Sequence, residues 1–473
     1  MRVSEAARLL GADYTGPDNV FQGCGIDSRT LLPGAMFVAL PGQRDGHDFV
    51  ALAAAGGAAA AMVERNQNHE LLPVIKVQSC YRALGQLAEI WRARFNRPVI
   101  AITGSNGKTT VKELLAAILR NQGPTHATWG NLNNELGVPL TLLGLGQEHH
   151  WAVVEMGANH PDEIARLTRI AHPTVGVITR CAPAHLEGFG NIEGVARAKG
   201  ELLENLDDTG IAVINADDPY VDLWHELAGN RRRITFGLDK PADVSADYQL
   251  MSDRVKLVLK TPIGHQCAQM TLLGRHNVLN ALAATAAAIA VGYFHESASG
   301  TTPSRSSFII KGEPTQHARF LETIAAGLMS VGSVNGRLQI KYAKNGARII
   351  DDTYNANPDS LTAALKVLAH YLKPRWLILG DMGELGERGP ELHEQAGVLA
   401  QKLGITRLFA TGTLSRHTVK AFGVEGYHYP DPEKLLCAVR AELTEETTAK
   451  DITILVKGSR SMRMERIADG LLA

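Results

Sequence analysis

The chain has 473 residues, of which 45% are hydrophobic and 21% are charged, and its formal net charge is −1. These values are typical of a globular protein of roughly three domains, and they exclude binding of nucleic acid or an anionic membrane by bulk charge. The five scattered cysteines favour a reducing compartment, and no apolar run reaches the ~20 residues of a membrane span, so we expect a cytoplasmic protein.

Residues 1–97 are predicted to form a first, small α/β unit. Strand patterns at 35–40 and 58–63 alternate with helix patterns at 49–57 and 81–95. The sequence Asn96-Arg97-Pro98 then breaks the chain before the next strand.

Two polar clusters stand at strand ends of this first unit, Ser28-Arg29 and Asp45-Gly46-His47. An arginine beside a serine can hold a phosphate through its forked guanidinium group. Taken alone, each cluster is more often an ordinary solvated turn.

A strand, a glycine turn and a helix follow at residues 99–120, and together they predict a phosphate site. The turn lacks the first glycine of the pattern G-x-x-x-x-G-K-[ST], because Ile102 stands in its place. Glycines let the backbone approach a phosphate, and the helix start adds free N–H groups and a positive dipole end. We expect Lys108 on the β- and γ-phosphates and the Thr109 hydroxyl on Mg²⁺. The predicted nucleotide-binding residues are Gly104, Ser105, Asn106, Gly107, Lys108, Thr109 and Thr110.

Strands and helices alternate through residues 98–333, with strand patterns at 151–155, 175–179 and 211–215. This order predicts a doubly wound, mainly parallel sheet, in which chemistry gathers at the carboxyl ends of the strands. Glu155 and His185 fall at such ends and could complete Mg²⁺ coordination with Thr109. An ordinary strand-end charge and a solvated loop histidine are the alternatives.

Three further helix residues and one segment stand out in this unit. Lys199 lies near an apolar helix face, where a lysine commonly extends its amine to water. Asn277 and Asn280 share a helix face and could read an adenine edge, although Asn277 could instead cap the helix. Residues 293–320 lose all periodicity and are predicted to be mostly a flexible surface insertion.

Residues 334–473 are predicted to form a Rossmann-like α/β unit without a G-x-G-x-x-G motif, so no dinucleotide cofactor is expected. Polar clusters at 351–358, 380–386 and 457–460 would meet at one end of its sheet and form a ligand site. The expected strands are 347–351, 376–379, 407–411 and 452–456, and the expected helices are 360–371, 391–403 and 432–443.

The order of the motifs along nearly the whole chain resembles the bacterial Mur ligase family. These motifs are residues 103–110, 130–137, 155–160, 184–190, 198–201, 274–280, 336–337 and 351–358. The resemblance implies three domains: 1–97 for a UDP-sugar, 98–333 for ATP and 334–473 for an incoming amine. The fold class expected is α/β, with a small N-terminal domain, a central P-loop domain with a doubly wound sheet, and a C-terminal Rossmann-like domain.

The resemblance also implies roles for residues across all three domains. Thr109 and Glu155 would hold one Mg²⁺ and His185 a second, while Lys199 would carry a carbamate that bridges the metals. The catalytic group would comprise Lys108, Lys199, His185 and Arg337, with Arg337 on the γ-phosphate. Asn277 and Asn280 would read adenine, and Asp352 would bind the ribose. Substrate contacts would come from Ser28, Arg29, His47, Asn133, Asn134, Tyr354, Asn355, Asn357 and Arg460.

Within the family, Tyr-Asn-Ala-Asn-Pro at 354–358 and Val-Lys-Gly-Ser-Arg at 456–460 resemble the members that add a dipeptide. The implied reaction joins D-alanyl-D-alanine to the carboxylate of UDP-MurNAc-tripeptide, with ATP and Mg²⁺, through an acyl phosphate. We expect a monomer that has no nucleic-acid partner. The alternatives are a sibling ligase for another amino acid, a related folate-type ligase and a non-catalytic ATP-hydrolysing regulator. The third residue of the tripeptide stays open, and Thr179-Arg180-Cys181 departs from the family's usual Asn-containing pair.

Overall fold

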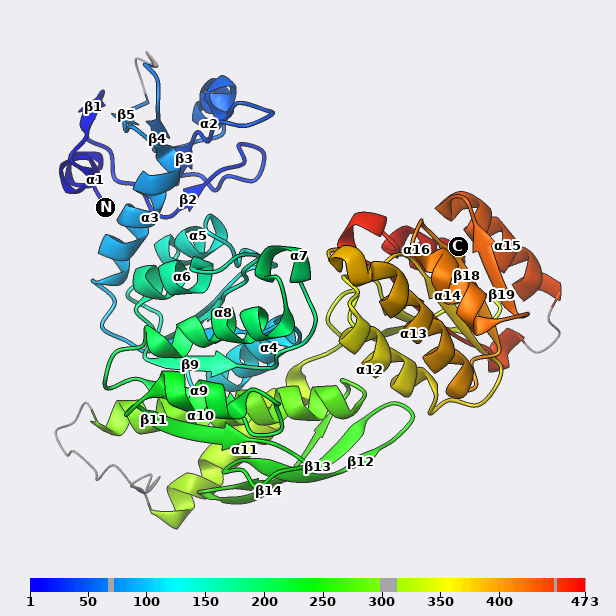
Figure 1. Ribbon diagram of the computed structural model, residues 1–473. Coiled ribbons are helices and arrows are strands. Elements are labelled where there is room, and N and C mark those ends of the chain that lie inside the picture. The colour runs from blue at the N-terminus through cyan, green and yellow to red at the C-terminus, as the bar shows by residue number, and fades with distance from the viewer. Residues whose placement is uncertain (67–71, 298–312, 446–448, 473) are drawn as a thin grey trace.

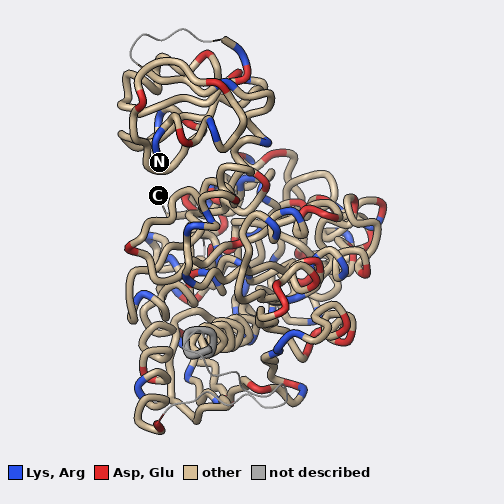
Figure 2. Tube along the Cα trace, turned by 90° about the vertical axis from the view of Figure 1, so that its left-hand side faces the viewer, with Lys and Arg blue, Asp and Glu red and all other residues tan. Residues whose placement is uncertain are grey.

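The computed structural model describes residues 1–66, 72–297, 313–445 and 449–472. These form a first sheet at one end, a central sheet with helices on both faces, and a third unit beside the central one (Figure 1). The predicted α/β class and three-part architecture are confirmed, while the limits at 97/98 and 333/334 stay predictions. Basic and acidic residues are interspersed along the trace seen from the side in Figure 2, in keeping with the balanced charge.

The first sheet is small and mostly parallel. Its strand order is β1-β5-β4-β3-β2, and only β1 runs antiparallel to its neighbour. The strands and their helices are α1 (Val3–Leu10), β1 (Asp13–Thr15), β2 (Cys24–Gly25), β3 (Met36–Val38), α2 (Val50–Ala55), β4 (Ala60–Val63) and β5 (Val74–Lys76).

Helix α3 (Cys80–Arg92) connects the first sheet to the central unit, where it packs on α5 (Gly137–Leu143) and α6 (Glu163–Ala171). The Trp91 indole N–H donates to the Leu145 carbonyl at 2.9 Å. The buried Arg92 guanidinium donates to the carbonyls of Ala171 at 2.7 Å and His172 at 2.8 Å. This helix therefore fastens the first unit to the helical layer of the second.

The central sheet is fully parallel, in the order β11-β10-β9-β6-β8-β7, which confirms the predicted doubly wound sheet. One face packs against α4 (Lys108–Arg120) and α10 (Arg275–Ser297), and the other packs against α6 and α8 (Ile192–Glu204). Its strands are β6 (Val99–Thr103), β7 (Thr125–Ala127), β8 (Trp151–Glu155), β9 (Val175–Ile178), β10 (Ile211–Asn215) and β11 (Arg232–Phe236).

A three-stranded antiparallel sheet, β12 (Ser245–Leu250), β13 (Val255–Thr261) and β14 (Gly264–Met270), was not predicted. It packs against α11 (Pro314–Ser330) (Figure 1). These strands have six or seven residues each. Most residues of β12 and β14 are at least partly exposed, so these two strands carry a weak sequence signal, whereas buried and exposed residues alternate in β13.

The predicted insertion over 293–320 is wrong at both ends, because α10 continues through Ser297 and α11 already begins at Pro314. A capping box between Glu313 and Gln316, with proline in the first turn, starts α11 before its apolar periodicity becomes visible. Residues 298–312 lie outside the described residues.

The third sheet has the order β15-β16-β20-β17-β18-β19, and all its neighbours are parallel except β15. Within the described ranges, no helix is long and apolar enough to span a bilayer. The strands are β15 (Gln339–Tyr342), β16 (Arg348–Asp352), β17 (Arg375–Leu379), β18 (Arg407–Thr411), β19 (Gly426–Tyr429) and β20 (Thr453–Lys457). The helices are α12 (Pro358–Leu368), α13 (Gly389–Lys402), α14 (Ser415–Phe422), α15 (Pro432–Glu445) and α16 (Glu465–Leu472).

Candidate active site

A cavity of about 1150 Å³ lies where the carboxyl edge of the central sheet meets the third unit. Most of the side chains predicted from the central and third units line it, although they come from segments more than 300 residues apart. Among them are Ser105, Asn106, Lys108, Thr109, Asn133, Asn134, Glu155, His185, Asn277, Asn280, Arg337, Asp352, Tyr354, Asn355, Asn357 and Arg460.

The phosphate loop turns between β6 and α4 on two glycines with positive φ, 143° at Gly104 and 87° at Gly107. A Cβ atom at Gly107 would lie 2.4 Å from Asn280 Oδ1, and one at Gly104 would lie 2.0 Å from Thr179 Oγ1. These positions therefore need glycine both for the backbone conformation and for the close approach. The result is a loop seated against α10, with the N-terminus of α4 directed at the cavity.

Lys108 lies beneath this loop and is held by it. Its Nζ donates to the Gly104 carbonyl at 2.6 Å. Burial lowers the pKa of Lys108, which Glu155 partly offsets. The ammonium is thus held at the phosphate loop, and its contact with the β- and γ-phosphates stays a prediction.

Glu155 ends β8 with only 1% of its surface exposed. One carboxylate oxygen accepts a hydrogen bond from Asn133 Nδ2 at 2.7 Å, while Oε2 is buried and has no hydrogen-bond partner among the described residues. An unpaired buried carboxylate oxygen and the Thr109 hydroxyl on the same cavity wall are hard oxygen donors that fit Mg²⁺. Within the described part of the chain, no three His, Cys, Asp or Glu residues form a metal cluster.

His185 begins the short helix α7 (Leu186–Phe189) in the left-handed conformation, with φ 53°. Its Nδ1 lies 2.6 Å from Glu384 Oε2 of the third unit, and this contact lowers the pKa of Glu384. The imidazole therefore bridges two units, and its Nε2 is the nitrogen left for a metal. The predicted ligand role of His185 is not tested by this arrangement.

Lys199 lies on α8 with 1% of its surface exposed, so the interpretation that its amine extends to water is wrong. Its Nζ donates to the Ala158 carbonyl at 3.3 Å and stands 5.2 Å from the centre of the Phe189 ring. Burial, reinforced by the positive charge of Lys108, lowers the pKa of Lys199 to about 7. A neutral amine is nucleophilic, which suits the carbamate that the family resemblance implies.

Asn277 lies inside the first turn of α10, so the alternative that it is the N-cap of this helix is wrong. Its amide donates to the Leu273 carbonyl at 2.8 Å, and Asn280 Nδ2 donates to Asn277 Oδ1 at 2.9 Å. The two amides are coupled to each other next to the phosphate loop. Their predicted contact with adenine is not tested by this structure.

Arg337 reaches from the third unit to the phosphate loop helix, where its Nη2 donates to Thr109 Oγ1 at 3.0 Å. Its guanidinium carbon lies 4.2 Å from the centre of the Tyr354 ring, so the two side chains are stacked. Arg337 thus lies between the predicted phosphate and amine positions.

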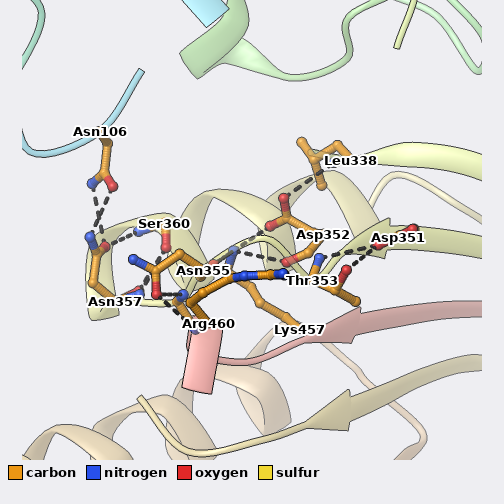
Figure 3. A network of polar contacts seen from close by, with 11 residues as sticks. Asn106, Leu338, Asp351, Asp352, Thr353, Asn355, Asn357, Ser360, Lys457 and Arg460 are labelled. Atoms are coloured by element: carbon orange, nitrogen blue, oxygen red, sulfur yellow. Dashed lines mark hydrogen bonds and ion pairs between the residues drawn. The ribbon is translucent and has the colours of Figure 1, made fainter. Parts of the chain in front are cut away.

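Asn357 is the N-cap of α12, and its Oδ1 accepts from the Ser360 backbone N–H at 2.9 Å (Figure 3). Its Nδ2 donates to Asn106 Oδ1 of the phosphate loop at 2.9 Å. Both ends of this amide are therefore engaged by protein. Asn355 Oδ1 accepts from the Arg460 backbone N–H at 3.3 Å, while the Arg460 guanidinium pairs with Glu465.

Lys457 and Arg180 are cavity residues to which the sequence analysis gave no individual role, although Lys457 belongs to the predicted polar cluster 457–460. Lys457 ends β20 and pairs with Asp352, and Arg180 Nη2 pairs with Asp359 across the two units at 2.8 Å. The sequence signal available for Lys457 was its position at the end of a buried apolar run. The partner of Arg180 is about 180 residues away, so no local pattern could have found it.

Ser28, Arg29 and His47 do not line the cavity. The exposed Arg29 side chain pairs with Asp27 at 2.6 Å. His47 is buried, with Nδ1 2.6 Å from Asp45 Oδ1 and Nε2 accepting from the Glu64 N–H at 2.9 Å. Their predicted contact with a UDP group is not tested by this geometry.

Comparison with known proteins gives matches along nearly the whole chain. Residues 102–288 match the Mur ligase middle domain, residues 336–460 the Mur ligase glutamate ligase domain, and residues 20–92 the Mur ligase family catalytic domain. The UDP-N-acetylmuramoyl-tripeptide–D-alanyl-D-alanine ligase of Escherichia coli is 39% identical, over 99% of this chain and 98% of that protein. The ligase of the same name in Bacillus subtilis is 33% identical, with the same coverage of both chains.

Two solved structures share this architecture. MurF from Acinetobacter baumannii superposes with a TM-score of 0.86 at 32% identity and covers 99% of this chain and 98% of its own. MurF ligase from Thermotoga maritima in complex with ADP gives a TM-score of 0.76 at 27% identity and covers 96% of this chain and 97% of its own.

Proposed function

The chain belongs to the Mur ligase family, and we propose that it is the ATP-dependent ligase that joins D-alanyl-D-alanine to the free carboxylate of UDP-MurNAc-tripeptide. The products are UDP-MurNAc-pentapeptide, ADP and phosphate. The observation that carries the proposal is Arg337, which reaches from beside the 352–357 loop to Thr109 of the phosphate loop helix. This contact brings a phosphate site and a candidate amine site into one cavity.

In this proposal each unit binds one substrate. Residues 1–97 hold the UDP-sugar, 98–333 hold ATP, and 334–473 hold the dipeptide, in a cytoplasmic monomer. Ser28, Arg29 and His47 contact the uridine diphosphate end, while Asn133 and Asn134 line the cleft near the peptide. The dipeptide site comprises Tyr354, Asn355, Asn357 and Arg460. Asn277 and Asn280 read adenine, and Asp352 lies near the ribose.

The first chemical step activates a carboxylate, which is a poor acyl donor in water. The terminal carboxylate of the tripeptide attacks the γ-phosphorus of ATP, the bond to ADP breaks, and an acyl phosphate forms. Lys108 and Arg337 stabilise the charge that develops on the transferring phosphoryl group. Thr109 and Glu155 would hold Mg²⁺, with His185 and carbamylated Lys199 at a second ion, and these cations supply further neutralisation of phosphate charge.

In the second step the dipeptide amine attacks the acyl carbon, and phosphate leaves from a tetrahedral intermediate. Water would hydrolyse the acyl phosphate if it reached the cavity first. The contacts between Asn106 and Asn357, Arg180 and Asp359, and His185 and Glu384 close the third unit over the phosphate loop. Closure of this kind keeps water out while the intermediate exists.

Phosphate release from ATP tests the proposal against its alternatives. We expect release only when UDP-MurNAc-tripeptide and D-alanyl-D-alanine are both present, with pentapeptide formed in equal amount. Equal release with either substrate absent would point to the regulator, and faster turnover with a single amino acid would point to a sibling ligase. A panel with lysine or diaminopimelate as the third residue of the tripeptide then defines the substrate.

A further inference from the structure

Lys457 is a buried cation in the wall of the cavity, with 2% of its surface exposed. It is the last residue of β20, where it lies in register with Asp352 of β16. Burying a charge is costly unless partners compensate for it. What Lys457 contacts therefore indicates what the charge does.

All acceptors of the Lys457 ammonium belong to one loop, residues 352–355. It forms an ion pair with Asp352 Oδ2 and donates to the Asn355 carbonyl at 2.9 Å and to the Asp352 carbonyl at 3.4 Å. Figure 3 shows these contacts converging on the lysine. An ammonium has three N–H donors, so none is left for a substrate.

The 352–355 loop in turn holds the chain on both sides of Arg337. The Tyr354 N–H donates to the Gly336 carbonyl at 3.1 Å, and the Leu338 N–H donates to Asp352 Oδ1 at 3.2 Å. Leu338 has a positive φ of 51°, a strained backbone for leucine that such contacts must maintain. The direction of Arg337 toward Thr109 thus depends on the loop that Lys457 fixes.

We propose that Lys457 is a positioning residue of the ligase: it fixes the 352–355 loop, and through it both Arg337 at the phosphate site and Tyr354 at the amine site. Asp352 takes part in this positioning, since both of its carboxylate oxygens are engaged by protein. The expected effect on turnover rests on the proposed function, whereas the coupling between Lys457 and the 352–355 loop does not.

Lys341→Met offers a matched control. Lys341 pairs with Asp351, the residue before Asp352, at 2.8 Å, but neither lines the cavity. Lys457→Met should lower kcat/KM for D-alanyl-D-alanine about 100-fold, because misplacement by about 1 Å costs that much. Lys341→Met should stay within about threefold of the parent enzyme. Equal turnover of Lys457→Met and Lys341→Met would overturn the proposal.

Two further variants separate positioning from folding. Lys457→Arg keeps the charge and should recover part of the lost turnover. Lys457→Met combined with Asp352→Asn removes the unpaired carboxylate, so it should regain thermal stability while kcat/KM stays low. Full recovery of kcat/KM in this double variant would contradict the proposal.

Amide hydrogen exchange provides a readout that needs no substrate. Residues 335–338 and 353–356 should exchange at least about tenfold faster in Lys457→Met than in Lys341→Met, because lost hydrogen bonds permit local opening. Unchanged exchange in both segments would overturn the proposal. If the parent enzyme does not use D-alanyl-D-alanine as a substrate, the proposed function is wrong. Amide hydrogen exchange in the two variants still tests whether Lys457 fixes the 352–355 loop.

Discussion

The phosphate end of the cavity and the polar turns of the first unit contain similar residue types but are held together differently. At the phosphate end, Arg337 bonds to Thr109 and Asn357 bonds to Asn106, partners more than 200 residues apart. In the first unit, Arg29 bonds to Asp27, only two residues away. Long-range pairing of polar side chains indicates a site assembled by the fold, whereas local pairing is what any stable turn requires.

The largest effect is expected from Lys108→Ala, which changes the phosphate end of the cavity. Turnover should fall about 10³-fold, because this ammonium stabilises the charge of phosphoryl transfer. The melting temperature should change little, since Lys108 bonds only to carbonyls of its own loop. Steady-state phosphate release and thermal melting check this expectation. Substantial remaining turnover would remove Lys108 from the phosphate site.

Lys199→Ala should lower turnover about 10²-fold, with partial rescue by short carboxylic acids that replace a carbamate. With the pKa of Lys199 lowered to about 7, the amine is neutral above that pH and protonated below it. Carbamylation, and with it turnover, should therefore rise as the pH increases through 7. Carbon-13 NMR with labelled bicarbonate checks the carbamate directly. A missing carbamate signal at pH 8 would contradict this role.

Arg29→Ala tests the polar turns of the first unit. If Arg29 binds the diphosphate, its loss should raise KM for UDP-MurNAc-tripeptide about tenfold and leave KM for ATP unchanged. Arg2→Ala is the control, because Arg2 forms a similar exposed pair with Asp18 in the same unit. Equal KM values in the two variants would mean that the Arg29–Asp27 pair only stabilises a turn.

The smallest effect is expected from replacing residues 298–312 with a short Gly-Ser connection between α10 and α11. Turnover should stay within about twofold of the parent enzyme, because lengthening or shortening a loop changes its closure entropy little. The cut leaves both helices intact as the structure bounds them. A tenfold loss would give this segment a role in the reaction.

The parts of the fold that the sequence predicted are those with strong local signals. The patterns at 151–155 and 211–215 are the bounds of β8 and β10, because buried parallel strands are short, continuous apolar runs. The antiparallel strands β12–β14 and the edge strands β15 and β19 were missed, since they are partly exposed and carry mixed side chains. The start of α11 was missed because a cap, not apolar periodicity, sets it.

The candidate site was predictable to the extent that each group follows a strand or opens a helix. Lys108, Glu155 and the 352–357 segment could be placed at strand ends in this way, and all of them line the cavity. The pairings that join the units could not be foreseen. Arg180 meets Asp359, and His185 meets Glu384, only once the third unit packs against the second.

Helix α3 bears on how the three units can move relative to one another. Its end is anchored by the Trp91 indole and the buried Arg92 guanidinium, which remains charged because its pKa falls only to about 10. The third unit joins the second through side-chain pairs on the cavity surface and through Leu273, which is buried in the hydrophobic core of the third unit. We therefore expect the first and second units to move as one body, and relative motion to take place where the third unit meets the second.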